Sequence, residues 1–328
     1  MNVSKQIKKE ISAILGEITN HLIINGSMVP FSGLLYGKFG ISLFFFHYGR
    51  YTGNSLYLEY ARYLVDLVKS QIHDDYPLDY EHGLAGVGIG LDYLGKYEYY
   101  DVDDDLIHQI DTKIIKALSY ESRVSLLIGF GKYLLSRYDS NPTFKNSIIQ
   151  LVDLIIHSSE PIQNILVDTI SFLYDLYLLD IEKEKIEAYL SDLIGVFISS
   201  VHKKPIYPQL FILIKLSQNP LNNNYCQIVH DLLQNIIIQK NMNFANIYDL
   251  QWLLCCEQFL KYVEYQGFML KLNRKIAKNI SSFHLFKLDD LFSENKNFAF
   301  EGGYAGLGLA LISILAPDNN SWTKLFKL

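Results

Sequence analysis

Three ionisable side chains stand directly before glycine-rich motifs of this sequence. Glu81 and His82 precede one motif, and Glu301 precedes another. Two carboxylates and an imidazole are suited to holding a hard metal ion or to activating a water molecule. They are also suited to binding a cationic or peptide substrate. A further interpretation is that each glutamate complements a helix dipole. The three residues are therefore candidates for catalysis, for partner binding or for helix stabilisation.

Four tyrosines lie near the predicted starts of apolar segments. They are Tyr36, Tyr207, Tyr248 and Tyr304. A tyrosine offers an apolar face together with a hydroxyl group, and this combination suits contact with an extended peptide. We therefore predict that these side chains bind a substrate or a partner. Partly buried packing is the alternative that the sequence leaves open.

The sequence contains three cysteines, Cys226, Cys255 and Cys256. An odd, low number argues against a disulfide framework and favours a reducing, cytoplasmic compartment. Adjacent helical side chains point about 100° apart, so Cys255 and Cys256 are not expected to bind one ion together. Because free cysteine is among the most buried residue types, we interpret this pair as core residues.

The elements that must position these side chains are helices that begin at repeated glycine motifs. Residues 33–40 read Gly-Leu-Leu-Tyr-Gly-Lys-Phe-Gly, residues 83–90 read Gly-Leu-Ala-Gly-Val-Gly-Ile-Gly, and residues 303–308 read Gly-Tyr-Ala-Gly-Leu-Gly. No strand is predicted before them and no Gly-Lys-Ser/Thr follows, so they are not phosphate loops. We interpret the glycines as positions of close helix–helix packing.

Weaker apolar segments recur between these motifs, near residues 123–137, 162–179, 206–216 and 248–262. Each follows a more amphipathic helical stretch, and the segments start roughly 40–55 residues apart, as in two-helix repeats. An acidic run at residues 101–105 is interpreted as the first turn of one amphipathic helix. We count about seven such units.

This repeat predicts an all-α fold, an α/α toroid (barrel) of about seven helical hairpins with an inner and an outer ring. A helix that is apolar all round must be buried on most sides. An open solenoid would need polar caps at its ends, whereas the first and last units here are the most apolar and glycine-rich. We therefore expect end-to-end closure within a single domain that spans residues 1–328.

Composition excludes two classes of partner. The formal net charge of −6 and the lack of a Lys/Arg-rich block argue against a nucleic-acid partner. The most apolar stretches, residues 41–48 and 307–316, are far shorter than the ~18–20 residues that span a bilayer. No secretory signal pattern is visible at the N-terminus. The expectation is a cytoplasmic protein without membrane insertion.

The three glycine motifs resemble the first, second and last repeats of the lanthionine synthetase C-like family, over residues 30 to 315. The resemblance implies an α/α toroid with a central cavity. It also implies a peptide cyclase, in which zinc activates a cysteine thiolate for addition to a dehydrated serine or threonine. The family places its ligands at the cavity rim, just before the first glycine of an inner helix. By that resemblance Glu81, His82 and Glu301 converge on one arc of the rim.

The sequence departs from the family pattern at the zinc ligands. Residues 205–208 read Pro-Ile-Tyr-Pro where the fifth repeat carries a Trp-Cys-Tyr-Gly-like motif. Residues 247–249 read Ile-Tyr-Asp where the sixth repeat carries Cys-His-Gly. The nearest histidine to the fourth-repeat His-Gly motif is His157, which no glycine follows. We therefore expect no bound zinc, no other metal and no other cofactor.

The function expected from these observations is binding of a precursor peptide or of a peptide-modifying enzyme, in a peptide-modification pathway of the lanthipeptide type. The chain would act there as a pseudoenzyme, without zinc-dependent cyclase chemistry. One alternative is an active hydrolase or cyclase on the same toroid that uses the carboxylates of Glu81 and Glu301. Another alternative is a structural helical-repeat scaffold.

Overall fold

The computed structural model describes residues 5–160, 165–201, 207–217, 227–228, 231, 251–252, 254–256, 298–316 and 318–326. Over these ranges the regular structure is α-helix and short 3₁₀-helix, and they contain no strand. The predicted all-α class is therefore confirmed. None of the helices in the described ranges is both long enough and apolar enough to cross a bilayer.

The chain divides into two compact units, each made of segments that are discontinuous in the sequence. The first unit comprises Met1–Phe31, Tyr36–Leu67 and Pro205–Thr323. The second unit comprises Ser32–Leu35, Val68–Lys204 and Lys324–Leu328. Because the chain passes between the units several times, neither is a simple stretch of sequence. The single domain over residues 1–328 stays a prediction.

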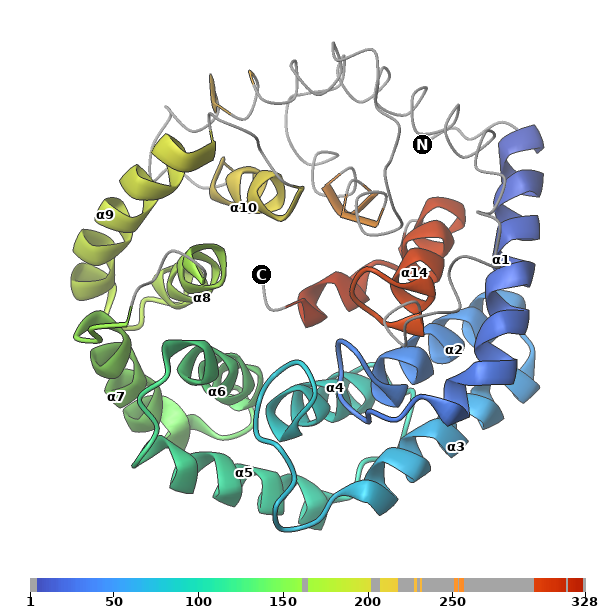
Figure 1. The fold of residues 1–328 in the computed structure, drawn as a ribbon, viewed down its shortest axis with the longest axis horizontal. Helices are drawn as coiled ribbons and strands as arrows, with labels where there is room; N and C mark the ends of the chain where they lie inside the picture. Colours follow the sequence, from blue (N-terminus) through green and yellow to red (C-terminus); the bar gives the residue numbers. More distant parts are fainter. Residues whose placement is uncertain are drawn as a thin grey trace. The chain divides into compact units, whose positions relative to one another are not determined.

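The second unit is a two-layer array in which apolar and amphipathic helices alternate. The apolar helices are α4 (Leu84–Lys96), α6 (Val124–Arg137) and α8 (Leu166–Leu178). The amphipathic helices are α5 (Asp104–Leu118), α7 (Lys145–Ile156), which follows the 3₁₀-helix η2 (Pro142–Phe144), and α9 (Lys183–Val201). Within this unit α6 packs between α4 and α8, while α5, α7 and α9 form the second layer (Figure 1).

Local sequence explains where these helices begin. At α5 the side chain of Asp103 accepts a hydrogen bond from the backbone N–H of Asp105 at 3.0 Å, and Asp104 lies in the same first turn. A carboxylate N-cap satisfies a donor that the helix leaves open, and the acidic turn complements the helix dipole. The interpretation of the acidic run at residues 101–105 as a helix start is confirmed.

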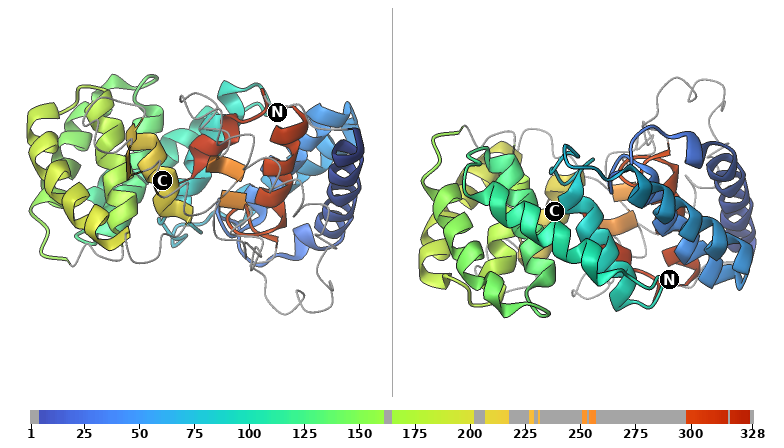
Figure 2. Two further views of the ribbon diagram at one scale, coloured as in Figure 1. Left: turned by 90° about the horizontal axis from the view of Figure 1, so that it is seen from above. Right: turned by 90° about the horizontal axis from the view of Figure 1, so that it is seen from below.

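The first unit contains the beginning of the sequence and its last helix. Its elements are α1 (Lys5–Asn25), η1 (Gly26–Met28), α2 (Lys38–Thr52), residues 55–67 of α3 (Ser55–Gln71), α10 (Tyr207–Ser217), α14 (Tyr304–Leu315) and the start of η6 (Ser321–Leu325). The last helix, α14, packs against both α2 and α1. Figure 2 shows the dark-blue α1 beside the red α14. The predicted contact between the first and last helical repeats is therefore present.

Glycines at matching places let neighbouring apolar helices approach each other. In each case an added Cβ would lie within 2.4 Å of an aromatic ring on the next apolar helix, a distance that real Cβ atoms do not reach. The pairs are Gly88 of α4 with Tyr133 of α6, Gly131 of α6 with Phe172 of α8, and Gly308 of α14 with Phe44 of α2. The same kind of contact thus joins consecutive apolar helices in the second unit. In the first unit it joins the last apolar helix, α14, to the first, α2.

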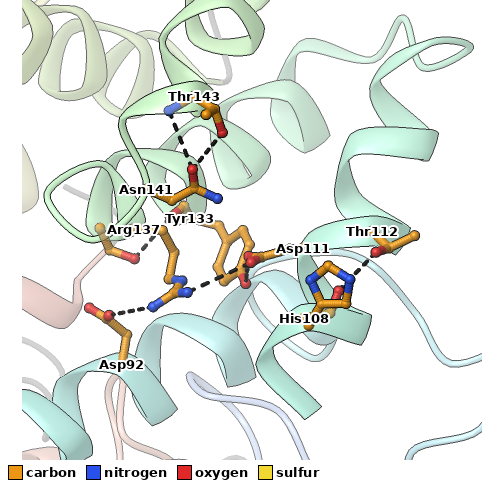
Figure 3. A network of polar contacts seen from close by, with 9 residues as sticks. Asp92, His108, Asp111, Thr112, Tyr133, Arg137, Asn141 and Thr143 are labelled. Atoms are coloured by element: carbon orange, nitrogen blue, oxygen red, sulfur yellow. Dashed lines mark hydrogen bonds and ion pairs between the residues drawn. The ribbon is translucent and has the colours of Figure 1, made fainter. Parts of the chain in front are cut away.

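A polar network crosses the core of the second unit (Figure 3). The Tyr133 hydroxyl donates to Oδ1 of the buried Asp111 at 2.5 Å. The Arg137 guanidinium lies 3.7 Å from the other oxygen of Asp111 and 3.5 Å from Oδ1 of Asp92. These contacts tie α4, α5 and α6 together and supply a partner for each charge, which a low-dielectric interior requires. The alternating helical layers are confirmed, and the number of seven hairpins stays a prediction.

Candidate functional site

Two of the predicted site residues meet in the first unit, although 265 residues separate them in the sequence. The Tyr36 hydroxyl donates to Oε2 of Glu301 at 2.9 Å. Tyr36 lies just before α2 and Glu301 just before α14, so the contact joins the starts of two packed helices. Both residues are half-buried. A hydrogen bond to an ionised carboxylate is stronger than one between neutral groups, so this pair fixes the Glu301 carboxylate.

The backbone around Glu301 is held by Gln251, which the sequence reading did not single out. The Gln251 side chain is fully buried. Its Nε2 donates to the carbonyl of Phe300 at 2.8 Å, and its Oε1 accepts from the N–H of Gly302 at 2.6 Å. The two bonds therefore lie on either side of Glu301. No local sequence signal marks this glutamine, because its role depends on a contact across about fifty residues.

Glycine is required at two positions here, one in the turn before α14 and one within the first turn of α14. Gly302 has a φ of +73°, in the left-handed region that residues with a Cβ rarely adopt. A Cβ on Gly306 would lie 1.8 Å from the Phe300 carbonyl oxygen and 2.1 Å from Nε2 of Gln251. The glycines before and within α14 therefore make room for the clamp on Glu301 as well as for helix packing.

Tyr304 is the first residue of α14 and is only 3% exposed. Its ring stacks on His21 of α1 at a centroid distance of 6.0 Å and lies 6.2 Å from the ring of Phe298. Burial raises the pKa of its hydroxyl. That hydroxyl has no hydrogen-bond partner among the residues that the structure describes. Its surroundings are those of a core residue, and its predicted contact with a partner stays a prediction.

Glu81 and His82 lie in a tightly packed turn of the second unit, just before α4. The Glu81 carbonyl accepts a hydrogen bond from the Leu35 N–H at 3.1 Å. The His82 N–H donates to Oδ1 of Asp79 at 2.7 Å, and its ring Nδ1 lies 3.3 Å from the same oxygen. Asp79 thus orients His82, a role that the sequence reading missed. Convergence of Glu81 and His82 with Glu301, which belongs to the other unit, stays a prediction.

The structure describes less of the two remaining predicted tyrosines, Tyr207 and Tyr248. Tyr207 is the first residue of α10. Tyr248 lies outside the described residues, as do Pro205, Ile206 and Ile247 of the sequence segments compared with the zinc motifs. Cys226 also lies outside them. Their predicted roles rest on the sequence alone.

The residues of the described ranges do not fit a zinc centre. Cys255 and Cys256 are both fully buried, and burial raises the pKa of each thiol. Zinc binds the thiolate form, so a thiol kept protonated is a poor ligand. Across the part of the chain that the structure describes, no three side chains of His, Cys, Asp and Glu gather in a cluster able to hold a metal ion. The interpretation of the cysteine pair as core residues agrees with their burial.

Comparison with known proteins supports the resemblance seen in the sequence. The model of the lanthionine synthetase C-like protein family matches residues 29–171. This range contains the first two glycine motifs and α2 to α8 in part or in full. No curated protein matches the chain. The glycine-packed apolar helices lie in the matched range, so residues 29–171 are similar to the lanthionine synthetase C-like family in both sequence motifs and helical packing.

Proposed function

We propose that this chain binds a peptide or protein partner in a peptide-modification pathway of the lanthipeptide type, without zinc-dependent cyclase chemistry. The observation that carries the proposal is the Tyr36–Glu301 pair at 2.9 Å. The hydrogen bond holds the Tyr36 hydroxyl and the Glu301 carboxylate in place. Residues 205–208 and 247–249, in contrast, lack the cysteine and histidine ligands that zinc chemistry needs. The family match over residues 29–171 supports a peptide as the class of partner.

The pair has the properties of a recognition site for a cation or an amino terminus. Glu301 supplies a carboxylate whose backbone is clamped by Gln251 and whose side chain is oriented by Tyr36. A preorganised acceptor loses little side-chain entropy when a ligand binds, and this raises the affinity. A lysine side chain or the terminal ammonium of a peptide is the matching donor.

A labelled precursor peptide tests the proposal. The probe is a synthetic copy of any precursor peptide that is encoded beside the gene for this chain, and fluorescence anisotropy measures its Kd for the full chain. Glu301→Gln removes the charge and is expected to weaken binding about tenfold, since a hydrogen bond to a charged group contributes about 1.5 kcal/mol or more. Tyr36→Phe is expected to weaken it by a smaller factor, about threefold.

Matched controls separate a site effect from a general one. Glu17→Gln changes an exposed carboxylate on α1, and Tyr120→Phe changes a tyrosine that is 68% exposed. Neither control is expected to alter the Kd. Equal affinity of the wild type and the Glu301→Gln variant would refute the assignment of this pair. A change in the mass of the peptide during incubation would instead favour the alternative of an active enzyme.

Metal analysis tests the zinc-free part of the proposal. The full chain, purified without chelator, is expected to contain zinc at far less than one equivalent. Adding zinc is expected to leave the Kd of the precursor peptide and the thermal unfolding midpoint unchanged, because a bound metal would stabilise the folded state by mass action. One equivalent of tightly bound zinc would contradict this part while leaving peptide binding to be judged by its own assay.

A further inference from the structure

A groove on the second unit is lined by none of the residues that the proposed function uses. It runs between the start of α6 and the face of α7, two helices that pack together in this unit (Figure 1). Its volume is about 910 Å³, which is in the range of sites that bind peptides and small molecules. Ile149 and Leu154, which are both half-buried, provide apolar surface in it.

Each charged side chain in this groove already has a partner. Arg123 forms two hydrogen bonds with Glu121, at 3.0 Å and 2.9 Å, which hold the pKa of Glu121 at about 2. Asp153 is paired with Lys185. Glu160 accepts a hydrogen bond from the Val124 N–H at 2.6 Å. A charged ligand would have to displace one of these contacts.

The start of α6 is closed to anions for the same reason. The N–H groups of Ser122 and Arg123 donate to Oε1 of Glu121 at 3.0 Å and 2.9 Å, and that of Val124 donates to Glu160. A helix N-terminus attracts an anion through open N–H donors, and here two carboxylates of the chain itself use them. A phosphate or carboxylate ligand is therefore disfavoured.

Neutral hydrogen-bonding groups remain. Asn146 and Gln150 are exposed on α7, and their side-chain amides make no hydrogen bond within the described ranges. The His157 ring uses Nδ1 toward the carbonyl of Asp153 at 2.8 Å, which leaves Nε2 directed elsewhere. A side-chain amide offers both a donor and an acceptor. The groove thus presents paired donors and acceptors beside apolar surface.

The spacing of the two amides matches an extended peptide. Asn146 and Gln150 are four residues apart, which is about one turn and about 6 Å along the helix. Alternate residues of an extended chain are about 6.6–6.8 Å apart and present their N–H and C=O groups on the same side. Side chains of the intervening residues then point to the opposite face. Each amide can therefore bond one peptide unit while every second side chain meets the apolar surface.

We propose that the groove between the start of α6 and α7 binds a neutral, extended peptide segment through the side-chain amides of Asn146 and Gln150. Apolar side chains at alternate positions of that segment pack on Ile149 and Leu154. A sugar would also offer neutral donors and acceptors. However, the only ring among the lining residues is the imidazole of His157, so the groove lacks the apolar aromatic face on which a sugar would stack. This site belongs to the second unit, and it does not depend on the Tyr36–Glu301 pair.

A displayed peptide library supplies the probe for this site. Random heptapeptides on phage are selected against the purified full chain, and the enriched sequences are synthesised with blocked termini and a fluorophore. The Asn146→Ala/Gln150→Ala double variant is expected to weaken their binding tenfold or more, because it removes two to four hydrogen bonds. N-methylation of the peptide units that face the two amides is expected to cause a similar loss.

Two controls make the outcome specific. Gln109→Ala removes an exposed amide from α5, outside the groove, and is expected to leave the Kd unchanged. Glu301→Gln is expected to leave it unchanged as well, so a failure of the proposed function and a failure of this site give different results. Selected peptides that bind the double variant as tightly as the wild type would overturn the proposal, as would a selection that enriches only charged sequences or none.

Discussion

Lowering the pH from 7 to 5 is expected to weaken the first unit by about 2 kcal/mol through one side chain, His47. This residue lies in the last turns of α2 and is 0% exposed. Its ring Nδ1 hydrogen-bonds to Oδ1 of Asn319, which follows α14. Burial lowers the pKa of His47 from 6.5 to about 4, the bond to Asn319 opposes that shift, and the nearby charge of Arg50 adds to it.

The direction of this change in stability follows from the pKa of His47 in the unfolded and in the folded chain. In the unfolded chain the imidazole binds a proton near pH 6.5, whereas in the folded chain it stays neutral until about pH 4. Between these values the unfolded state binds more protons, so the free energy of unfolding falls as the pH falls. The full effect is about 3 kcal/mol, because one pKa unit corresponds to about 1.4 kcal/mol. About 2 kcal/mol of it falls between pH 7 and pH 5, above the range in which most carboxylates titrate.

Tryptophan fluorescence during urea unfolding measures this effect where it occurs. The chain has two tryptophans, Trp252 and Trp322, and both are buried in the first unit. Trp322 donates to the Ser313 hydroxyl at 2.9 Å, and that hydroxyl donates to the carbonyl of Asn319 at 2.6 Å. The fluorophore is therefore connected to the residue that pairs with His47. The free energy of unfolding is compared at pH 7 and pH 5 in the same salt concentration.

His47→Gln is the decisive variant, because glutamine keeps an N–H donor for Asn319 but does not titrate. Its stability is expected to change about 2 kcal/mol less than that of the wild type between the two pH values. His108→Asn, on the exposed face of α5, is expected to retain the wild-type difference. An identical pH difference in the wild type and in His47→Gln would refute the reasoning, since His47 would then not be buried in its neutral form.

Four further substitutions test the packing. Gly308→Ala places a Cβ 2.4 Å from the Phe44 ring and is expected to destabilise the first unit by about 1–3 kcal/mol in urea unfolding. Gly16→Ala in α1, where nothing lies within 4 Å, is expected to add up to about 1 kcal/mol of stability. Tyr133→Phe removes the donor to buried Asp111 and is expected to cost about 1–3 kcal/mol, seen by circular dichroism during thermal unfolding. Tyr304→Phe removes a buried hydroxyl without a partner in the described ranges, so stability is expected to stay within about 0.5 kcal/mol or to rise. A larger loss would mean that this hydroxyl has a partner.

Features that depend on neighbours in the sequence were predictable. The acidic run at residues 101–105 signals a helix start because a cap and a helix dipole act within one turn. The glycine motifs predicted close packing, and the contact of Gly308 with Phe44 shows that packing. The apolar segment predicted near residues 123–137 is α6, Val124–Arg137. Periodicity alone is enough for such assignments, since burial of an apolar face sets the pattern.

Features that depend on pairs distant in the sequence were not predictable. Gln251 resembles any other glutamine in a helical stretch, and only the packing of the first unit brings it to the backbone on both sides of Glu301. Tyr36 and Glu301 were both named as candidates, but from separate reasoning and for separate roles. That one donates to the other follows from the packing of α14 on α2, which no local pattern encodes. The burial of His47 had one signal in the sequence, because this residue directly follows a run of three phenylalanines.

Three contacts within the first unit together define how its last helix meets its first apolar helix. Tyr36 before α2 meets Glu301 before α14, Phe44 within α2 meets Gly308 within α14, and His47 near the end of α2 meets Asn319 after α14. The pairs follow the same order along both helices, so α2 and α14 run parallel. Successive apolar helices in a repeat of two-helix units also run parallel, because each is separated from the next by one returning helix.

The last apolar helix therefore contacts the first as a neighbouring repeat would. The glycine–aromatic contact between α14 and α2 is the same in kind as those between α4 and α6 and between α6 and α8. In an open array the outward face of the first repeat would need a polar cap. Here α2 instead buries Phe44, Phe45 and Phe46 completely. Helix α14 is thus part of the core around the first apolar helix, and the carboxylate proposed to bind a partner is fixed by the same packing of α14 on α2.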